Sequence, residues 1–78
     1  MSNEIQQHII NAFNLYAKIG EGNVKGTAIW NYVARRVEVS ADDIMQWIDE
    51  CADEAGCVRF CGTPEFRNTF YTRMRPTV

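Results

Sequence analysis

Apolar residues recur at helical spacing in the first part of the chain. Over residues 1–19 they fall on one face of a helix, at Ile5, Ile9, Phe13 and Tyr16. The side chain of Ser2 or Asn3 is expected to cap this helix by accepting hydrogen bonds from its first backbone amides. Glycine tolerates the left-handed backbone of a helix end, so we predict that segment 20–23, which holds Gly20 and Gly22, ends the helix.

A second helix is predicted to begin with Thr27 as its N-cap. It ends at Arg35 and Arg36, because cations suit the negative end of a helix dipole. Its inner face consists of Ile29, Tyr32 and Val33. Val24 and Lys25, just before this helix, lie between two turn signals and fit a short strand.

The third predicted helix begins after Ser40 and ends at Gly56. Ser40 and Asp43 have the spacing of a capping box, with aspartate in the position that glutamate usually takes. The inner face of this helix consists of Ile44, Ile48, Cys51 and Ala55. Gly56 follows where a C-terminal glycine is expected.

The C-terminal part of the chain predicts a β-hairpin. Residues 57–61 and 66–74 alternate in polarity, and the turn segment 62–64 separates them. We expect one side of the hairpin to cover the core with Val58, Phe60, Phe66, Phe70 and Met74. The opposite side then carries Arg59, Arg67, Thr69, Tyr71, Arg73 and Arg75. A bulge of one residue would reverse this assignment.

The order of these elements resembles the winged helix-turn-helix superfamily over residues 3–75. The resemblance rests on the block TAIWNYV at residues 27–33, on Val39 and Ser40 before the third helix, and on the spacing from Ile44 to Gly56. It implies an α+β fold, a winged helix of three helices and a two-stranded wing, and we expect a single domain over residues 1–78. In this superfamily the third helix lies in the major groove of DNA, and the wing contacts phosphates or the minor groove.

The charges of the chain are distributed unevenly. Residues 1–57 hold nine acids and four bases, a net −5, whereas residues 58–78 hold four arginines and one acid, a net +3. The outward side of the third helix carries six acids and no base: Asp42, Asp43, Asp49, Glu50, Asp53 and Glu54. Phosphates repel such a helix, because affinity for DNA comes from Lys and Arg. The asymmetry indicates either an interaction surface or two halves that neutralise each other in the fold. The acids of the third helix are either simply solvated, or a docking surface for a basic partner, or direct readers of base edges in the groove.

Two functions from different classes remain. The first, favoured by what the superfamily usually does, is a DNA-binding, transcription-regulator-like protein. Its expected contacts are Lys25, Gln46, Arg59, Arg67, Tyr71, Arg73 and Arg75. The alternative, favoured by charge, is an interaction module, an adaptor or inhibitor, that binds a basic partner protein. Its expected contacts are Asp42, Met45, Asp49, Glu50 and Asp53.

Other classes of function find no support in the residues. Cys51, Cys57 and Cys61 lack the fourth ligand that zinc needs, since His8 is remote, so we expect reduced thiols and no metal. His8 has no partners for nucleophilic catalysis, and we expect neither enzyme activity nor a cofactor nor a small-molecule substrate. No apolar run of about 18 residues predicts a membrane span, and the N-terminus lacks the pattern of a signal peptide. We therefore expect a cytoplasmic protein.

Overall fold

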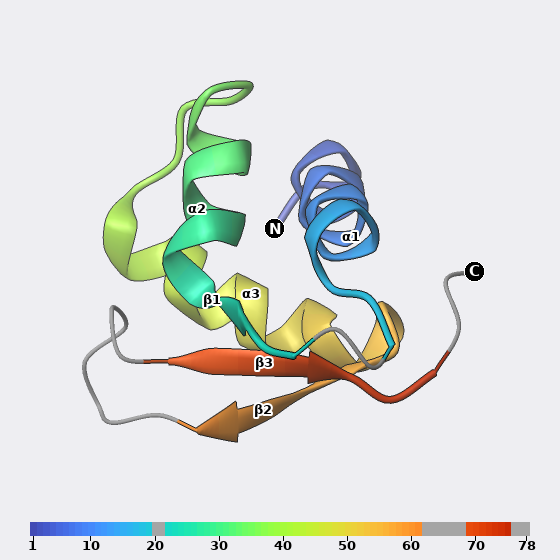
Figure 1. The fold of residues 1–78 in the computed structure, drawn as a ribbon. Helices are drawn as coiled ribbons and strands as arrows, with labels where there is room; N and C mark the ends of the chain where they lie inside the picture. The colour runs from blue at the N-terminus through green and yellow to red at the C-terminus, as the bar shows by residue number, and fades with distance from the viewer. Residues whose placement is uncertain (20–21, 62–68, 76–78) are drawn as a thin grey trace.

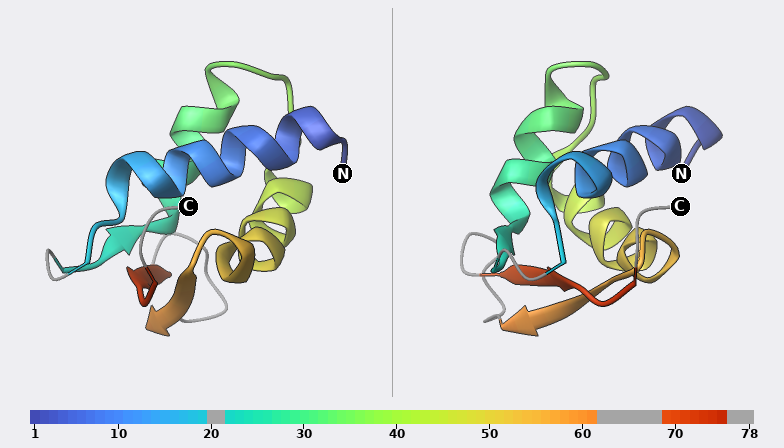
Figure 2. Two further views of the ribbon diagram at one scale, coloured as in Figure 1. Left: turned by 90° about the vertical axis from the view of Figure 1, so that its right-hand side faces the viewer. Right: turned by 45° about the vertical axis from the view of Figure 1, so that its right-hand side comes forward.

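Three helices lie on one side of a three-stranded antiparallel sheet (Figures 1 and 2). This computed structural model describes residues 1–19, 22–61 and 69–75. In chain order the elements are α1 (Asn3–Tyr16), β1 (Val24–Lys25), α2 (Gly26–Ala34), α3 (Ala41–Glu54), β2 (Cys57–Cys61) and β3 (Phe70–Arg73). The predicted α+β arrangement is confirmed, including the short strand near Val24. In the described part of the chain, no helix is long and apolar enough to cross a membrane.

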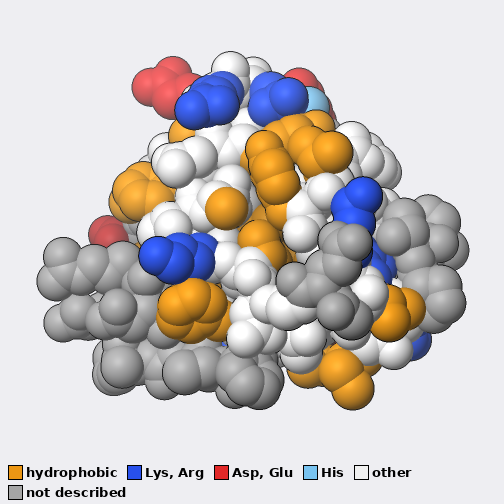
Figure 3. Space-filling view, in the orientation of Figure 1, with side chains coloured by type: hydrophobic (Ala, Val, Ile, Leu, Met, Phe, Trp, Pro, Cys, Tyr) orange, Lys and Arg blue, Asp and Glu red, His pale blue; other side chains and the backbone are white. Residues whose placement is uncertain are grey.

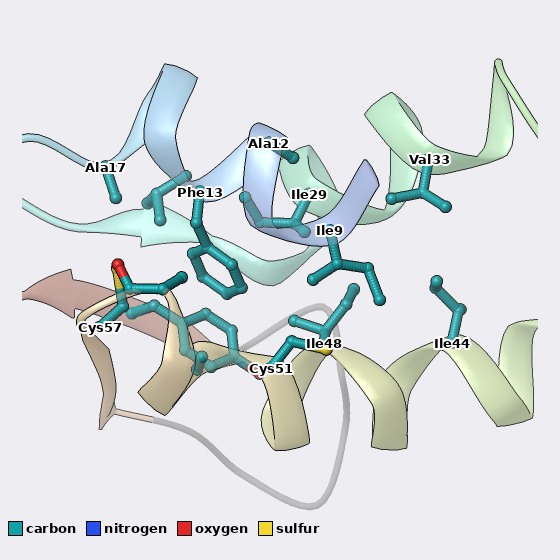
Figure 4. Close-up of a cluster of buried hydrophobic side chains, with 14 residues drawn as sticks. Ile9, Ala12, Phe13, Ala17, Ile29, Val33, Ile44, Ile48, Cys51 and Cys57 are labelled. Carbon is teal, nitrogen blue, oxygen red and sulfur yellow. The ribbon is translucent and has the colours of Figure 1, made fainter. Parts of the chain in front are cut away.

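The core lies where the inner faces of the helices meet above the sheet. Figure 4 shows Phe13 and Ile9 of α1 and Ile29 of α2 pointing toward Ile48 of α3, and all four side chains are fully buried. The sheet contributes Tyr71, whose ring meets that of Phe13 edge to face with 5.2 Å between the centroids. Burial of these large side chains is the main stabilising contribution in a chain this small.

Helix α1 begins as expected but ends early. Ser2 Oγ accepts a hydrogen bond from the amide of Ile5 at 3.2 Å, so the predicted cap is confirmed. The helix ends at Tyr16, before the glycine-containing segment, because Ala17 has an extended backbone and a buried side chain. The carbonyl of Ala17 is thereby turned toward β3, where Arg73 Nε donates a hydrogen bond to it at 2.5 Å.

Helix α2 begins one residue before the predicted cap. Its N-cap is Lys25, which makes no side-chain capping hydrogen bond, and Thr27 lies within the helix, so Thr27 is not the cap. The reason is that β1 leads directly into α2. The amide of Gly26, the first helical residue, donates to the carbonyl of Thr69 at 2.9 Å, which satisfies a group that a capping side chain would otherwise serve.

Helix α3 has the ends that its sequence predicts. Ser40 Oγ accepts from the amide of Asp43 at 3.2 Å and donates to the carboxylate of Asp43 at 2.8 Å. Gly56 ends the helix with a φ of +82°, a conformation that favours glycine. A Cβ at this position would lie 3.2 Å from Arg75 Cβ and 3.3 Å from Arg73 Nη1, so the close approach of the chain also favours glycine.

The side of the hairpin that faces the core is opposite to the predicted side. The strands run in the order β1-β3-β2, and Cys57 pairs with Arg73 and Arg59 with Tyr71. The buried side chains of β3 and the residue before it are Thr69, Tyr71 and Arg73, whereas Val58 and Met74 are exposed and Phe70 is only partly buried. A bulge lies between Arg59 and Cys61. Residues 66 and 67 and the side chain of Phe60 lie outside the described part of the chain.

The helices explain why Tyr71 and Arg73, rather than the more apolar residues, face inward. Tyr71 fills the space beside Phe13, and Arg73 meets backbone carbonyls at the ends of α1 and α3. Val24 of β1 pairs with Tyr71 and is buried beside it. The polarity pattern of the strand cannot predict which side chains point inward, because the packing and hydrogen-bond partners of Tyr71 and Arg73 come from other segments.

Candidate functional site

The solvent-exposed side of α3 is acidic along its whole length. Its inner side, with Ile44, Ile48, Cys51 and Ala52, is buried. Its charged residues are all exposed and all acidic: Asp42, Asp43, Asp49, Glu50, Asp53 and Glu54. The positive end of the helix dipole stabilises the carboxylates of the first turn, Asp42 and Asp43. This effect does not extend to the four acids of the later turns, so helix stability does not account for them.

A hollow of about 410 Å³ lies between this acidic side of α3 and the hairpin. From α3 its lining includes Asp42, Met45, Gln46, Asp49 and Glu50, and from the hairpin Arg59 and Thr69. Four of the five residues predicted to bind a basic partner therefore meet in one place. The fifth, Asp53, is not among the described lining residues.

Asp49 is held in this hollow by two side chains of the hairpin. The hydroxyl of Tyr71 donates to Asp49 Oδ1 at 2.5 Å, and Arg59 Nη1 lies 3.4 Å from Asp49 Oδ2. Arg59 Nη2 also donates to Thr69 Oγ1 at 3.2 Å. Burial raises the pKa of Tyr71, and the hydrogen bond to Asp49 raises it further, so the phenol remains a donor. The carboxylate of Asp49 is thus fixed in orientation and partly neutralised.

The other acids of α3 differ in how far the protein itself satisfies them. Asp53 lies near Arg75, with 3.8 Å between Oδ1 and Nη2, and Glu54 accepts from Gln6 Nε2 at 2.5 Å. Glu50 accepts from Gln46 Nε2 at 3.0 Å, which supplies no charge. The side chain of Asp42 makes no ion pair or hydrogen bond with the described residues. Asp42 and Glu50 therefore leave the hollow with negative charge that Arg59 does not balance.

Two residues predicted to contact nucleic acid lie in the interior. Tyr71 is fully buried and Arg73 is 5% exposed, so the expectation that they form a solvent-facing stripe is wrong. Tyr71 belongs to the core beside Phe13 and supports Asp49. Arg73 instead joins the ends of two helices to the sheet.

Every N–H group of the Arg73 guanidinium has an acceptor within the protein. Nε donates to the carbonyl of Ala17 at 2.5 Å. Nη1 donates to the carbonyls of Ala55 and Arg75, at 2.8 and 3.1 Å. Nη2 donates to the carbonyl of Phe13 at 3.2 Å and to Asn14 Oδ1 at 2.9 Å. A guanidinium has five N–H donors, so none of them remains for a ligand.

The acceptors of Arg73 are carbonyl oxygens, and none is a carboxylate. The carbonyls of Phe13, Ala17 and Ala55 belong to the C-terminal ends of α1 and α3, where unpaired carbonyls carry the negative end of the helix dipole. The positive charge is therefore stabilised by oriented dipoles. A second hollow, of about 280 Å³, lies beside Arg73 and is lined by Asn14, Lys18 and Ile19, but the arginine offers it no donor.

The remaining residues predicted to contact nucleic acid do not form one continuous surface. Gln46 and Arg59 line the hollow on α3. Lys25 is exposed on β1, which is at the opposite edge of the sheet from β2 and Arg59. Arg75 donates to the carbonyl of Asp53 and lies near its carboxylate. Arg67 lies outside the described residues.

One residue of the hollow was missed in the sequence. Thr69 was expected on the solvent-facing side of the hairpin and was not a candidate for binding, yet it is buried and contributes to the wall. No signal in the residue type would reveal it, because its place depends on the reversed facing of β3. Tyr71 lies on the same side of the strand as Thr69, and its contact with Phe13 shows that this side faces the core. That contact cannot be read from the sequence.

The described thiols are buried and weakly acidic. Burial raises the pKa of Cys51 from 9.0 to about 11, and the nearby carboxylates of Glu54 and Glu50 add to this effect. Burial also raises the pKa of Cys57, although Arg73 and Arg75 oppose the shift. The thiolate is the reactive form, and a raised pKa keeps both thiols protonated. The two residues are packed as small apolar groups, as predicted for reduced cysteines.

No protein-family model, no curated protein and no solved structure matches this chain.

Proposed function

We propose that this chain is a winged-helix domain that acts as a protein-interaction module and binds a basic segment of a partner protein along α3. The observation that carries the proposal is the hollow beside α3, where three carboxylates, from Asp42, Asp49 and Glu50, surround a space that contains one described guanidinium, that of Arg59. A lysine or arginine side chain of the partner would bring the missing positive charge. Met45 and the neighbouring hairpin would contact its aliphatic part.

The same geometry makes DNA the less favoured ligand. The topology is compatible with a winged helix, whose third helix usually enters the major groove, but here that helix carries six acids. The arginines of the described part of the hairpin do not offset them, because Arg73 is buried and Arg59 and Arg75 lie against carboxylates of α3. Phosphates would therefore meet net negative charge at the expected contact surface.

Charge reversal in the hollow tests this proposal. Asp42→Lys combined with Glu50→Lys changes two exposed side chains that pair with no cation among the described residues. The fold is expected to persist, because the loss of the favourable interaction of Asp42 with the helix dipole costs only about 1 kcal/mol or less. The probe is a fluorescent arginine-rich peptide at low salt. We expect the double variant to bind it at least about tenfold more weakly than the wild type, because charge complementarity is lost.

The matched control is Glu4→Lys with Glu38→Lys, which makes the same change in net charge away from the hollow. Unchanged peptide affinity in the Asp42 and Glu50 variant, or an equal loss in the control, would contradict the proposal. Duplex DNA serves as the competing ligand. Tight, salt-dependent binding of DNA that Lys25→Ala weakens would support the DNA-binding function instead.

A further inference from the structure

A second exposed patch lies where the end of α1 meets α2. Leu15 and Tyr16, in the last turn of α1, are 53% and 46% exposed. Both are large and apolar, and their burial would be favourable by the usual relation between apolar area and free energy. We call Leu15, Tyr16, Tyr32 and Arg36 the α1–α2 patch.

Contacts between the side chains of Tyr16, Tyr32 and Arg36 join the two helices, and Leu15 precedes Tyr16 in the last turn of α1. The ring of Tyr16 meets that of Tyr32 edge to face, with 6.1 Å between the centroids and 85° between the planes. The guanidinium carbon of Arg36 lies 3.5 Å from the centroid of the Tyr32 ring. Arg36 Nη1 also donates to the carbonyl of Tyr32 at 2.8 Å, which fixes the guanidinium on the ring. The patch is therefore preorganised, which lowers the entropic cost of binding.

Basic side chains predominate around the patch, and the acids Glu4 and Glu38 lie just beyond the two segments that form it. Within residues 5–19 and 22–37 the charged side chains are Lys18, Lys25, Arg35 and Arg36, and there is no acid. All four are exposed. Figure 3 shows hydrophobic side chains gathered between α1 and α2, with Lys and Arg side chains beside them and acidic side chains at the upper edge of this face. The patch thus combines apolar area with positive charge, whereas α3 is acidic.

We propose that the α1–α2 patch docks an amphipathic, acidic helix of a partner protein, whose apolar face covers Leu15 and Tyr16 and whose carboxylates meet Arg35 and Arg36. Helices commonly bind by placing apolar residues of one face between two helices of the receptor. A second copy of this chain fits less well, because its acidic helix α3 has its apolar face buried in its own core. The module would then join a basic partner on α3 to an acidic one on α1 and α2.

The probe for this proposal is a synthetic helix with leucine along one face and glutamate at the remaining positions, followed by fluorescence anisotropy. We expect Leu15→Ser and Arg36→Glu each to weaken its binding at least about tenfold. Met74→Ser is the matched control for Leu15→Ser, because Met74 is 64% exposed on another surface. Arg36→Lys should retain part of the affinity, since it keeps the charge but loses the planar contact with Tyr32.

Several outcomes would overturn the inference. These are failure of the wild type to bind the probe at about millimolar concentration, equal binding of a peptide with lysine in place of glutamate, and equal loss in Met74→Ser. Binding of anionic lipid vesicles or of single-stranded DNA, but not of the peptide, would assign the patch to another ligand. Self-association that Leu15→Ser abolishes would assign it to a second copy. The Asp42→Lys, Glu50→Lys variant should bind the leucine and glutamate peptide normally, so this proposal and the function of α3 can fail independently.

Discussion

Two arginines of the hairpin, Arg59 on β2 and Arg73 on β3, lie in opposite environments although both belong to the basic C-terminal part of the chain. Arg73 is buried and donates to five oxygens at the ends of α1 and α3 and near the C-terminus. Arg59 is exposed beside a hollow and lies against Asp49 of α3. The comparison shows that a basic sequence need not produce a basic surface. One arginine stabilises the fold, and the other partly neutralises an acidic helix.

The largest expected effect is that of Arg73→Met. This change removes the guanidinium donors from the carbonyls of Phe13, Ala17 and Ala55, which lie at the ends of α1 and α3. We therefore expect a loss of about 3 kcal/mol or more in the free energy of unfolding. Urea denaturation followed by circular dichroism measures it. Arg35→Met is the control, since Arg35 is exposed at the end of α2. A change as small as that of the control would mean that Arg73 is not a structural residue.

The next effect concerns alkaline pH. The pKa of Cys51 is raised from 9.0 to about 11 in the folded protein, so the unfolded chain loses its thiol proton first as the pH rises. Stability supplied by the protonated thiol is therefore complete below pH 9 and is lost between pH 9 and 11, with an amplitude of the order of 2 kcal/mol. Denaturation midpoints across this range should fall less steeply for Cys51→Ala. Parallel curves for the two proteins would contradict this assignment.

Tyr71→Phe removes the hydroxyl that donates to Asp49 but keeps the ring beside Phe13. Hydrogen bonds to charged groups contribute more than neutral ones, and we expect a loss of about 1–2 kcal/mol, well below that of Arg73→Met. Thermal or urea unfolding measures this loss. If Tyr71 instead contacted a nucleic acid from the surface, the free protein would keep its full stability after the substitution.

Arg59→Ala should have the smallest effect on stability, below about 1 kcal/mol, because an exposed ion pair contributes little. It should strengthen binding of an arginine-rich peptide to the hollow, since it removes a positive charge from the wall. The free energy of unfolding and the peptide affinity together distinguish the role of Arg59 at the surface from that of Arg73 in the interior. Weaker peptide binding in Arg59→Ala would show that the guanidinium contributes to the surface in another way.

The sequence predicts well where an element depends on its own residues. Ser40 and Gly56 bound α3 as expected, because caps and left-handed glycines are local features. The acidic side of α3 follows from helical spacing alone. The facing of β3 could not be predicted, because the partners of Arg73 at Phe13 and Ala17 lie 60 and 56 residues away in the chain. Helix α1 was predicted to continue to residue 19, but it ends at Tyr16, and the carbonyl of the next residue, Ala17, accepts from Arg73.

Whether α3 binds basic segments is tested most directly by titrating isotope-labelled protein with an arginine-rich peptide and following backbone amide shifts by NMR. If the hollow on α3 binds basic segments, the shifts will concentrate at the lining residues Asp42, Met45, Gln46, Asp49 and Glu50. These shifts will diminish as salt is added. Shifts absent from α3, or a stronger response to duplex DNA centred on the hairpin and Lys25, would contradict the account.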